Sequence, residues 1–373
     1  MKKALGIYVH LPFCLKKCNY CDFCSFPRRE EDMSGYVSEL CRRIETYGAR
    51  AADHTVDTVY FGGGTPTLVP IDLFEKILNV IRKNYHIADG AEISCECNPA
   101  SCNSEYLSSL FGLGVNRLSI GLQSASDSEL RILGRAHSFN DFLATFKGAR
   151  AAGFSNISAD LMYALPSQSL SDFERSLTVL ADLSPEHISA YGLKIEEGTP
   201  FYKSYDSLEL PDDDEQLGMY LLLCSYLRER GYEKYEISNF ARKGMESRHN
   251  LKYWSGGEYL GFGVAAHSFF GGERFGNSRD MEAFLRGEDI VFERYVPTSA
   301  EKHDEFVMLS LRLAKGLDLE EYRSRFGKDL LAAHSSLGSY IDGGFMAIDE
   351  GHLSFTDKGF FVSNYILSEL IES

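Results

Sequence analysis

Short, β-rich apolar runs alternate with longer segments of helical periodicity through the first half of the chain. The six runs span residues 5–11, 56–62, 91–97, 115–123, 156–165 and 186–195. The helical segments include 35–50 and 71–83, and the second of these follows Pro70 and has Asp72 in its first turn. Such alternation is typical of parallel strands covered by helices. The sequence therefore predicts an α/β fold built on a partial (β/α)6 barrel.

Unusual polar and glycine residues gather at the carboxyl ends of these expected strands. They comprise "CLKKCNYCDFC" (14–24), "GGGTP" (62–66), "ECNP" (96–99), Gln123 and Asp160. In a (β/α) barrel the carboxyl ends of the strands meet at one face, and active sites are built there. We therefore expect the functional site of this protein at that face.

The charge balance and the hydropathy pattern limit the partners that the chain can have. It carries 54 acidic against 38 basic side chains, a formal charge of -16 spread along 373 residues. This argues against nucleic acid as a partner. No apolar run reaches the roughly 18 residues that a membrane span needs, and the N-terminus becomes polar too soon for a signal peptide. We expect a cytoplasmic protein without a transmembrane span.

The cysteines indicate a metal site rather than disulfides. There are nine, and four of them fall within residues 14–24. Cytoplasmic thiols stay reduced, so an odd count with four crowded together favours metal. Structural zinc usually takes two Cys-x-x-Cys pairs a dozen or more residues apart, whereas compact runs suit iron–sulfur clusters; zinc is the alternative. The other cysteines are expected to be buried as small apolar side chains: Cys41, Cys95, Cys97, Cys102 and Cys224.

The spacing of the first three cysteines carries a family resemblance. They form Cys-x3-Cys-x2-Cys after the first expected strand, and Tyr20 precedes the third. In this feature the chain resembles the radical S-adenosylmethionine (SAM) superfamily. The resemblance implies that Cys14, Cys18 and Cys21 hold three irons of a [4Fe–4S] cluster. It also implies that SAM binds the fourth iron and is cleaved to a 5′-deoxyadenosyl radical. Cys24 is not expected to be a ligand.

Several strand-end residues are candidates for holding SAM. The glycines of "FGGGTP" let backbone groups approach a ligand closely, and the resemblance places the methionine part of SAM there; a plain glycine turn is the alternative. Glu96 alternates with Cys95 and Cys97, so we expect it to face the barrel interior and bind ribose hydroxyls, or to pair with Arg117. Other candidates match SAM-binding positions of the resembled proteins, with a structural hydrogen-bond network as the alternative. The full set is Tyr8, Gly63, Gly64, Thr65, Glu96, Gln123, Arg135 and Asp160.

Five further stretches narrow the resemblance. They are "YVHLPFC", "GVNRLSIGLQSASDSELRILGRAH", "DLMYALPSQS", "HISAYGLKIEEGTPFY" and "YEISNFARKGMESRHNLKYWSGGEYLGFGVAAHS". Together they resemble the coproporphyrinogen III dehydrogenase (HemN) family over nearly the whole chain. The segment "HNLKYW" (249–254) is similar to the HNxxYW pattern of the HemW branch, the haem chaperones. Tyr8 comes early, where the dehydrogenases have a long extension that helps to cover the porphyrin, and this also favours HemW. Cys24 departs from the cysteine pattern of both branches.

The HNLKYW segment contains the candidates for haem binding. His249 is a suitable axial ligand for haem iron, and Tyr253 would share its face if the segment were helical. Trp254 offers a flat ring to a macrocycle. Packing of the histidine and tryptophan in a core is the alternative, and His267 and Cys24 are competing iron ligands.

The chain divides into three expected parts. A radical SAM core spans 1–210, a middle segment with HNLKYW spans 211–295, and a small, mainly helical module spans 296–373, for which a winged helix is one candidate. The resemblance implies a haem chaperone that transfers haem to acceptor haemoproteins, with membrane respiratory proteins as one candidate class. Two enzyme functions remain as alternatives: decarboxylation of coproporphyrinogen III by the deoxyadenosyl radical, and radical-dependent opening of haem.

Overall fold

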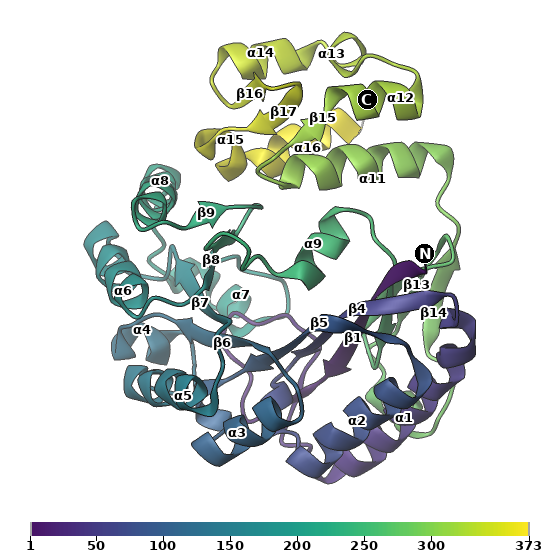
Figure 1. The fold of residues 1–373 in the computed structure, drawn as a ribbon. Coiled ribbons are helices and arrows are strands. Elements are labelled where there is room, and N and C mark those ends of the chain that lie inside the picture. Colours follow the sequence, from purple (N-terminus) through teal and green to yellow (C-terminus); the bar gives the residue numbers. More distant parts are fainter. Residues whose placement is uncertain (1, 372–373) are drawn as a thin grey trace.

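Six parallel strands form the centre of the computed structural model, which describes residues 2–371 (Figure 1). Each strand pairs in parallel with the next one along the chain. They coincide with the six predicted strands, so the predicted α/β architecture is confirmed. The strands are β1 (Lys3–Leu11), β4 (His54–Gly63), β5 (Ile87–Cys97), β6 (Arg117–Gln123), β7 (Ile157–Tyr163) and β8 (His187–Gly192).

Helices follow these strands and lie on the outer side of the sheet (Figure 1). Three of them begin with capping boxes, in which Ser138, Ser169 and Asp212 are the N-cap residues, and these caps fix where the helices begin. The predicted helices at 35–50 and 71–83 are present. The helices of this layer are α1 (Met33–Gly48), α2 (Ile71–Asn84), α3 (Ser104–Gly112), α4 (Asp127–Ile132), α5 (Phe139–Ala152), α6 (Leu170–Asp182) and α8 (Asp213–Glu229). The short helix α7 (Pro200–Lys203) lies inside this layer, where the Phe201 backbone N–H donates to the Asn19 carbonyl of the cysteine loop.

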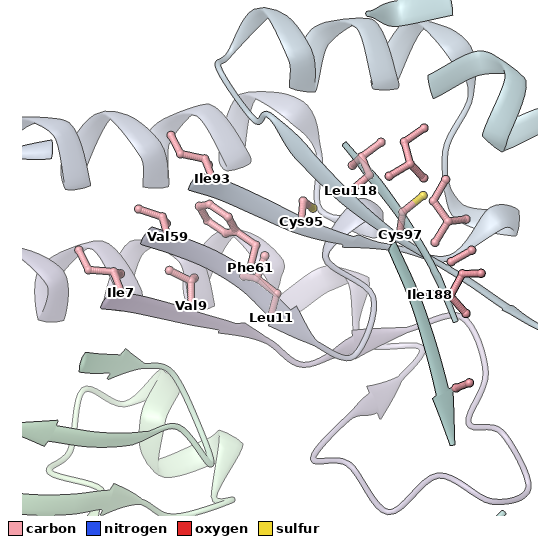
Figure 2. Packing of buried hydrophobic residues seen from close by; sticks show 14 of the residues in the cluster. Ile7, Val9, Leu11, Val59, Phe61, Ile93, Cys95, Cys97, Leu118 and Ile188 are labelled. Carbon is pink, nitrogen blue, oxygen red and sulfur yellow. The ribbon is translucent and has the colours of Figure 1, made fainter. Parts of the chain in front are cut away.

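The apolar core lies between the parallel strands and this layer of helices. Figure 2 shows Val9 of β1, Phe61 of β4 and Leu118 of β6 packed with their neighbours in this core, and all three are fully buried. Because successive side chains of a strand point to opposite faces, the residues between them face the inner side of the sheet. Tyr8 and Tyr60 are such residues, and the inner side is consequently polar and aromatic.

Short strands from the second half of the chain extend both edges of this sheet to twelve strands. The strand β11 (Tyr259–Phe262) pairs in parallel with β1, and β12 (His267–Phe270), β13 (Glu273–Asn277) and β14 (Val291–Tyr295) follow in antiparallel fashion. At the other edge β10 (Asn239–Ala241) pairs antiparallel to β8, and β9 (Glu233–Lys234) pairs antiparallel to β10. The helix α9 (Arg248–Trp254) lies between the sheet and α11 (Ser299–Arg312), and α10 (Met281–Leu285) packs on α1 (Figure 1).

The C-terminal part is mainly helical and carries a small antiparallel sheet of order β15-β17-β16. The boundaries predicted at 210/211 and 295/296 stay predictions. None of the helices within residues 2–371 is long and apolar enough to cross a membrane. After α11, the elements are β15 (Leu317–Asp318), α12 (Leu319–Phe326), α13 (Leu330–Ala333), α14 (Ser336–Asp342), β16 (Met346–Asp349), β17 (His352–Phe355), α15 (Asp357–Phe361) and α16 (Ser363–Ile371).

Candidate functional site

A cavity of about 330 Å³ opens at the carboxyl ends of the parallel strands. Its volume lies in the range of small-molecule sites. The loop after β1 and the ends of β4, β5, β6 and β7 all contribute to it, so residues far apart in the sequence converge. Ten of the predicted site residues line this cavity: Cys14, Cys18, Cys21, Gly63, Gly64, Thr65, Glu96, Gln123, Arg135 and Asp160.

The cysteine loop forms one wall of the cavity. Two short parallel strands, β2 (Phe13–Cys14) and β3 (Phe26–Pro27), pair with each other and close the loop. Burial raises the pKa of the Cys21 thiol to about 11, and the nearby Cys18 and Cys14 thiols act in the same direction. Three neighbouring thiols therefore resist ionisation unless a cation is present. The ionised thiolate is the form that binds metal.

The fourth cysteine of the run is turned away from this wall. Cys24 is buried in the apolar core and does not line the cavity. Its backbone carbonyl accepts a hydrogen bond from Nε2 of His10 at 2.8 Å. Cys24 therefore has different surroundings from the other three cysteines. This agrees with the prediction that it is not a cluster ligand.

The donor set suits a cluster better than a single ion. No three His, Cys, Asp or Glu side chains within residues 2–371 converge closely enough to hold one metal ion. Zinc needs its thiolates around a single point, whereas each cysteine of a [4Fe–4S] cluster binds a different iron. Arg135 lies beside the thiols, with Nη1 at 3.6 Å from Sγ of Cys18, and its charge can offset the negative charge of thiolates. The ligand assignment itself stays a prediction.

The glycine turn after β4 is packed directly against the cysteine loop. Gly63 has a φ of +117°, and a Cβ added there would lie 2.7 Å from the His10 ring. A Cβ at Gly64 would lie 2.6 Å from the carbonyl oxygen of Phe13. The Thr65 hydroxyl lies 3.6 Å from Sγ of Cys14. Because any side chain would clash here, only glycine permits this close approach of backbone to the loop.

Glu96 is a half-buried carboxylate at the floor of the cavity. It accepts hydrogen bonds from the Tyr60 hydroxyl at 2.9 Å and from the Gly63 backbone N–H at 3.1 Å. Burial raises the pKa of Glu96 to about 7, and the nearby Asp160 carboxylate adds to this. Within the described residues no ion pair joins Glu96 to Arg117, which was the alternative. The remaining lone pairs of Glu96 are available to hydroxyl donors of a ligand.

Gln123 and Arg135 form a second polar wall. Gln123 adopts a φ of +70°, unusual for a residue with a side chain, and its Oε1 accepts a hydrogen bond from the Tyr191 hydroxyl at 2.8 Å. Arg135 donates to the Gly121 carbonyl at 3.1 Å. Its Nε is buried and has no hydrogen-bond partner within residues 2–371. A buried donor without a partner at a cavity wall fits a site whose ligand supplies the acceptor.

Asp160 and Tyr8 differ in their relation to the cavity. Asp160 lines it and accepts a hydrogen bond from Ser119 at 3.1 Å, and burial raises its pKa. Tyr8 lies below the glycine turn and outside the cavity lining. Its hydroxyl is hydrogen-bonded to Nδ1 of His10 at 2.9 Å. Tyr8 is thus connected to the cysteine loop through His10, which is hydrogen-bonded to the Cys24 carbonyl.

Several lining residues of the cavity were not among the sequence candidates, and two of them come from the ends of strands. Met162 and Tyr191 line the cavity from the ends of β7 and β8. Both lie at the carboxyl ends of predicted strands, as Gln123 and Asp160 do. Their position at a strand end was therefore the signal by which the sequence could have identified them.

The HNLKYW segment lies away from this cavity, in α9 beneath β4. His249 is 1% exposed, and its Nδ1 and Nε2 are hydrogen-bonded to Thr58 at 2.9 Å and Tyr253 at 2.8 Å. Burial lowers the pKa of His249 to about 3, so the ring is neutral. The predicted shared face of His249 and Tyr253 is confirmed. Trp254 is half-buried, with the Arg312 guanidinium 5.8 Å from its ring centre. The assignment of these residues to haem stays a prediction.

Comparison with known proteins defines the class of this molecule. Residues 8–180 match the profile of the radical SAM superfamily, and residues 298–362 match that of the HemN C-terminal domain. The fold and the strand-end cavity together are those of a radical SAM protein.

Relatives that match along most of the chain narrow the class to a family. Heme chaperone HemW of Bacillus subtilis (strain 168) is 33% identical over 100% of this chain and 99% of that protein. Heme chaperone HemW of Mycobacterium tuberculosis (strain CDC 1551 / Oshkosh) is 35% identical over 85% of this chain and 84% of that protein. This chain belongs to the HemW family, as the sequence resemblance predicted.

A solved structure shows the same fold. Coproporphyrinogen III oxidase (HemN) from Escherichia coli matches with a TM-score of 0.86 at 23% sequence identity. The match covers 99% of this chain and 90% of that one. The shared architecture includes the C-terminal part as well as the parallel strands.

Proposed function

We propose that this protein is a haem carrier of the HemW type, which binds haem and transfers it to acceptor haemoproteins. The observation that carries the proposal is the full-length relationship to a heme chaperone, at 33% identity over the whole chain. The HNLKYW segment, which follows the HNxxYW pattern, supports it. Membrane respiratory proteins are the candidate class of acceptors.

The strand-end cavity is proposed to hold a [4Fe–4S] cluster and SAM. Cys14, Cys18 and Cys21 would bind three irons, and when bound the reduced cluster supplies the electron that cleaves SAM. Glu96 would accept hydrogen bonds from ribose hydroxyls. Arg135 would balance the negative charge of the thiolates. The chain's own contribution is to orient the ligand and to exclude water.

Haem is the proposed cargo and is expected near α9. His249, Tyr253 and Trp254 are the candidates that the sequence offers. For His249 to bind iron, one of its two ring hydrogen bonds would have to be replaced by the metal. Tyr253 is the member of this group that reaches a second pocket of the protein.

The experiment that tests the proposal offers two substrates to one preparation. The protein is reconstituted anaerobically with iron and sulfide, and hemin and coproporphyrinogen III are added in separate samples with SAM and reductant. We expect a shifted Soret band and a stoichiometric complex with hemin. We expect no vinyl porphyrin from coproporphyrinogen III.

Two results would reject the carrier function. Accumulation of vinyl product in step with 5′-deoxyadenosine would assign the protein to decarboxylation. Consumption of hemin with formation of an open tetrapyrrole would assign it to haem degradation.

A further inference from the structure

A second pocket, of about 340 Å³, lies beside α9 on the side away from the cysteine loop. Six elements enclose it, namely α9, β11, β12, β13, β14 and α11, and Figure 1 shows the helices and the edge strands around this region. Each element contributes one side chain that matters below: Tyr253, Tyr259, His267, Arg274, Tyr295 and Met308. A histidine, three tyrosines and a methionine around one space are an unusual combination for a structural gap.

His267 lines this pocket and has the surroundings that are typical of a metal-binding histidine. Its side chain is 57% exposed, and Nδ1 lies 3.6 Å from Oε1 of Glu293 on the neighbouring part of the sheet. Nε2 has no hydrogen-bond partner within residues 2–371. A histidine that binds a metal commonly directs its other ring nitrogen to a carboxylate. His249, in contrast, is enclosed and uses both ring nitrogens.

The backbone beneath His267 is shaped to let its ring lie flat on the sheet. A Cβ added at Gly276 of β13 would lie 2.8 Å from the imidazole. Phe292 on the edge strand β14 meets the ring at 89°, with centroids 6.1 Å apart, and is 61% exposed. An exposed aromatic ring thus stands next to His267, just outside the pocket lining, which suits a flat ligand that has to be released again.

The aromatic walls of the pocket are held in place. Tyr253 meets Tyr259 edge to face at a centroid distance of 4.6 Å, and its hydroxyl is fixed by His249 at 2.8 Å. His249 in turn is stacked on Tyr60 at 5.3 Å, and Tyr60 donates to Glu96 at the floor of the first cavity. A continuous chain of contacts thus joins the second pocket to the strand-end cavity.

The charges of the pocket favour a positively charged centre. Arg274 is paired with Glu305 at 2.6 Å, and Glu293 adds a second carboxylate beside His267. The pocket therefore offers no unpaired cation to carboxylates, and the two carboxylates of a haem would remain in water at the open side. Ferric haem has a positively charged iron centre, and the Glu293 carboxylate beside His267 favours such a charge, whereas Glu305 is already neutralised by Arg274.

We infer that haem is held in this second pocket, with Nε2 of His267 as an axial ligand of the iron, Glu293 supporting the imidazole, and His249 acting as a positioning residue for Tyr253. The inference rests on the proposed function and assigns its cargo to a site. It gives the HNLKYW segment a role in which Tyr253 forms the wall of the pocket and His249 is not itself a ligand.

The test is a hemin titration of the full-length protein, followed by the Soret band. His267→Ala should shift the band and weaken hemin binding at least about tenfold, and Glu293→Gln should weaken it by roughly tenfold. The control His86→Ala removes another exposed histidine and should change neither. Iron-free protoporphyrin IX should bind wild type and His267→Ala with equal affinity. It has no iron for His267 to bind, so it contacts only the aromatic walls of the pocket.

The outcomes separate this inference from the proposed function. If wild type binds no hemin, both the proposed haem carrier function and the proposed haem site are wrong. If wild type binds hemin and His267→Ala has the same spectrum and affinity, the site is wrong while the carrier proposal stands. If His267→Ala loses iron-free porphyrin as strongly as hemin, the residue shapes the pocket and the ligand assignment is overturned. Unchanged melting temperatures exclude loss of folding as the cause.

Discussion

Protonation of Glu96 should control how tightly the strand-end cavity binds SAM. Its pKa is raised to about 7 by burial, so roughly one carboxylate in eleven is ionised at pH 6 and ten in eleven at pH 8. Only the ionised form is purely an acceptor for ribose hydroxyls. SAM affinity should therefore rise about tenfold between pH 6 and pH 8, which corresponds to about 1.4 kcal/mol. In Glu96→Gln the pH dependence should vanish, and affinity at pH 8 should fall by about 1.5–3 kcal/mol.

The assay is calorimetric titration of the cluster-loaded protein with SAM at the two pH values. Glu236→Gln is a matched control, because burial also raises the pKa of Glu236 to about 7 while the residue lies outside the cavity. This variant should keep the pH dependence of wild type. Equal SAM affinity of wild type at pH 6 and pH 8, or an unchanged affinity in Glu96→Gln, would refute the reasoning.

Three further predictions concern the cysteine loop and its support. Cys24→Ala should keep the cluster absorption near roughly 400 nm, whereas Cys21→Ala should lose it; loss of iron in both would show that Cys24 is a ligand. Burial lowers the pKa of His10 to about 4, so the stability it contributes above pH 6.5 is lost as the pH falls towards 4. Between pH 7.5 and pH 5 the free energy of unfolding in urea should drop about 2 kcal/mol more in wild type than in His10→Asn, and an equal drop would contradict the buried neutral ring. Gly63→Ala should cost roughly 1–3 kcal/mol of unfolding free energy and weaken SAM binding. Gly90→Ala, which also has a positive φ but open space around it, should leave SAM binding intact, and equal SAM affinity in both variants would show that contact with His10 does not matter.

The parallel strands could be predicted because each carries its own signal. In the buried strand β6, Leu118, Ile120 and Leu122 recur at every second position. The residues at the carboxyl end of such a strand in a barrel fall at one face. For that reason Glu96, Gln123 and Asp160 could be predicted as site residues from their positions at the ends of strands. Cys24 was separated from the other cysteines by the Cys-x3-Cys-x2-Cys pattern of the resembled superfamily, and the assignment of the ligands stays a prediction.

The edges of the sheet and the second pocket could not be predicted in the same way. The strands β9 to β14 are two to five residues long, too short for periodicity to register. Their pairing is decided by contacts between distant segments, such as Gly6 with Tyr259. The burial of His249 follows from its contact with Thr58, 191 positions earlier, and no local pattern reports such a contact.

Transfer of haem to an acceptor is the decisive measurement for the proposed function as a haem carrier. Reconstituted protein loaded with hemin is mixed with an apo-haemoprotein such as apomyoglobin, with SAM and reductant present, and the appearance of the acceptor's spectrum is followed. We expect complete transfer, faster from wild type than from a Cys18→Ala variant carrying the same hemin, and no loss of total haem. Retention of haem by the protein, transfer no faster than from the Cys18→Ala variant, or chemical conversion of the porphyrin during the incubation would contradict it.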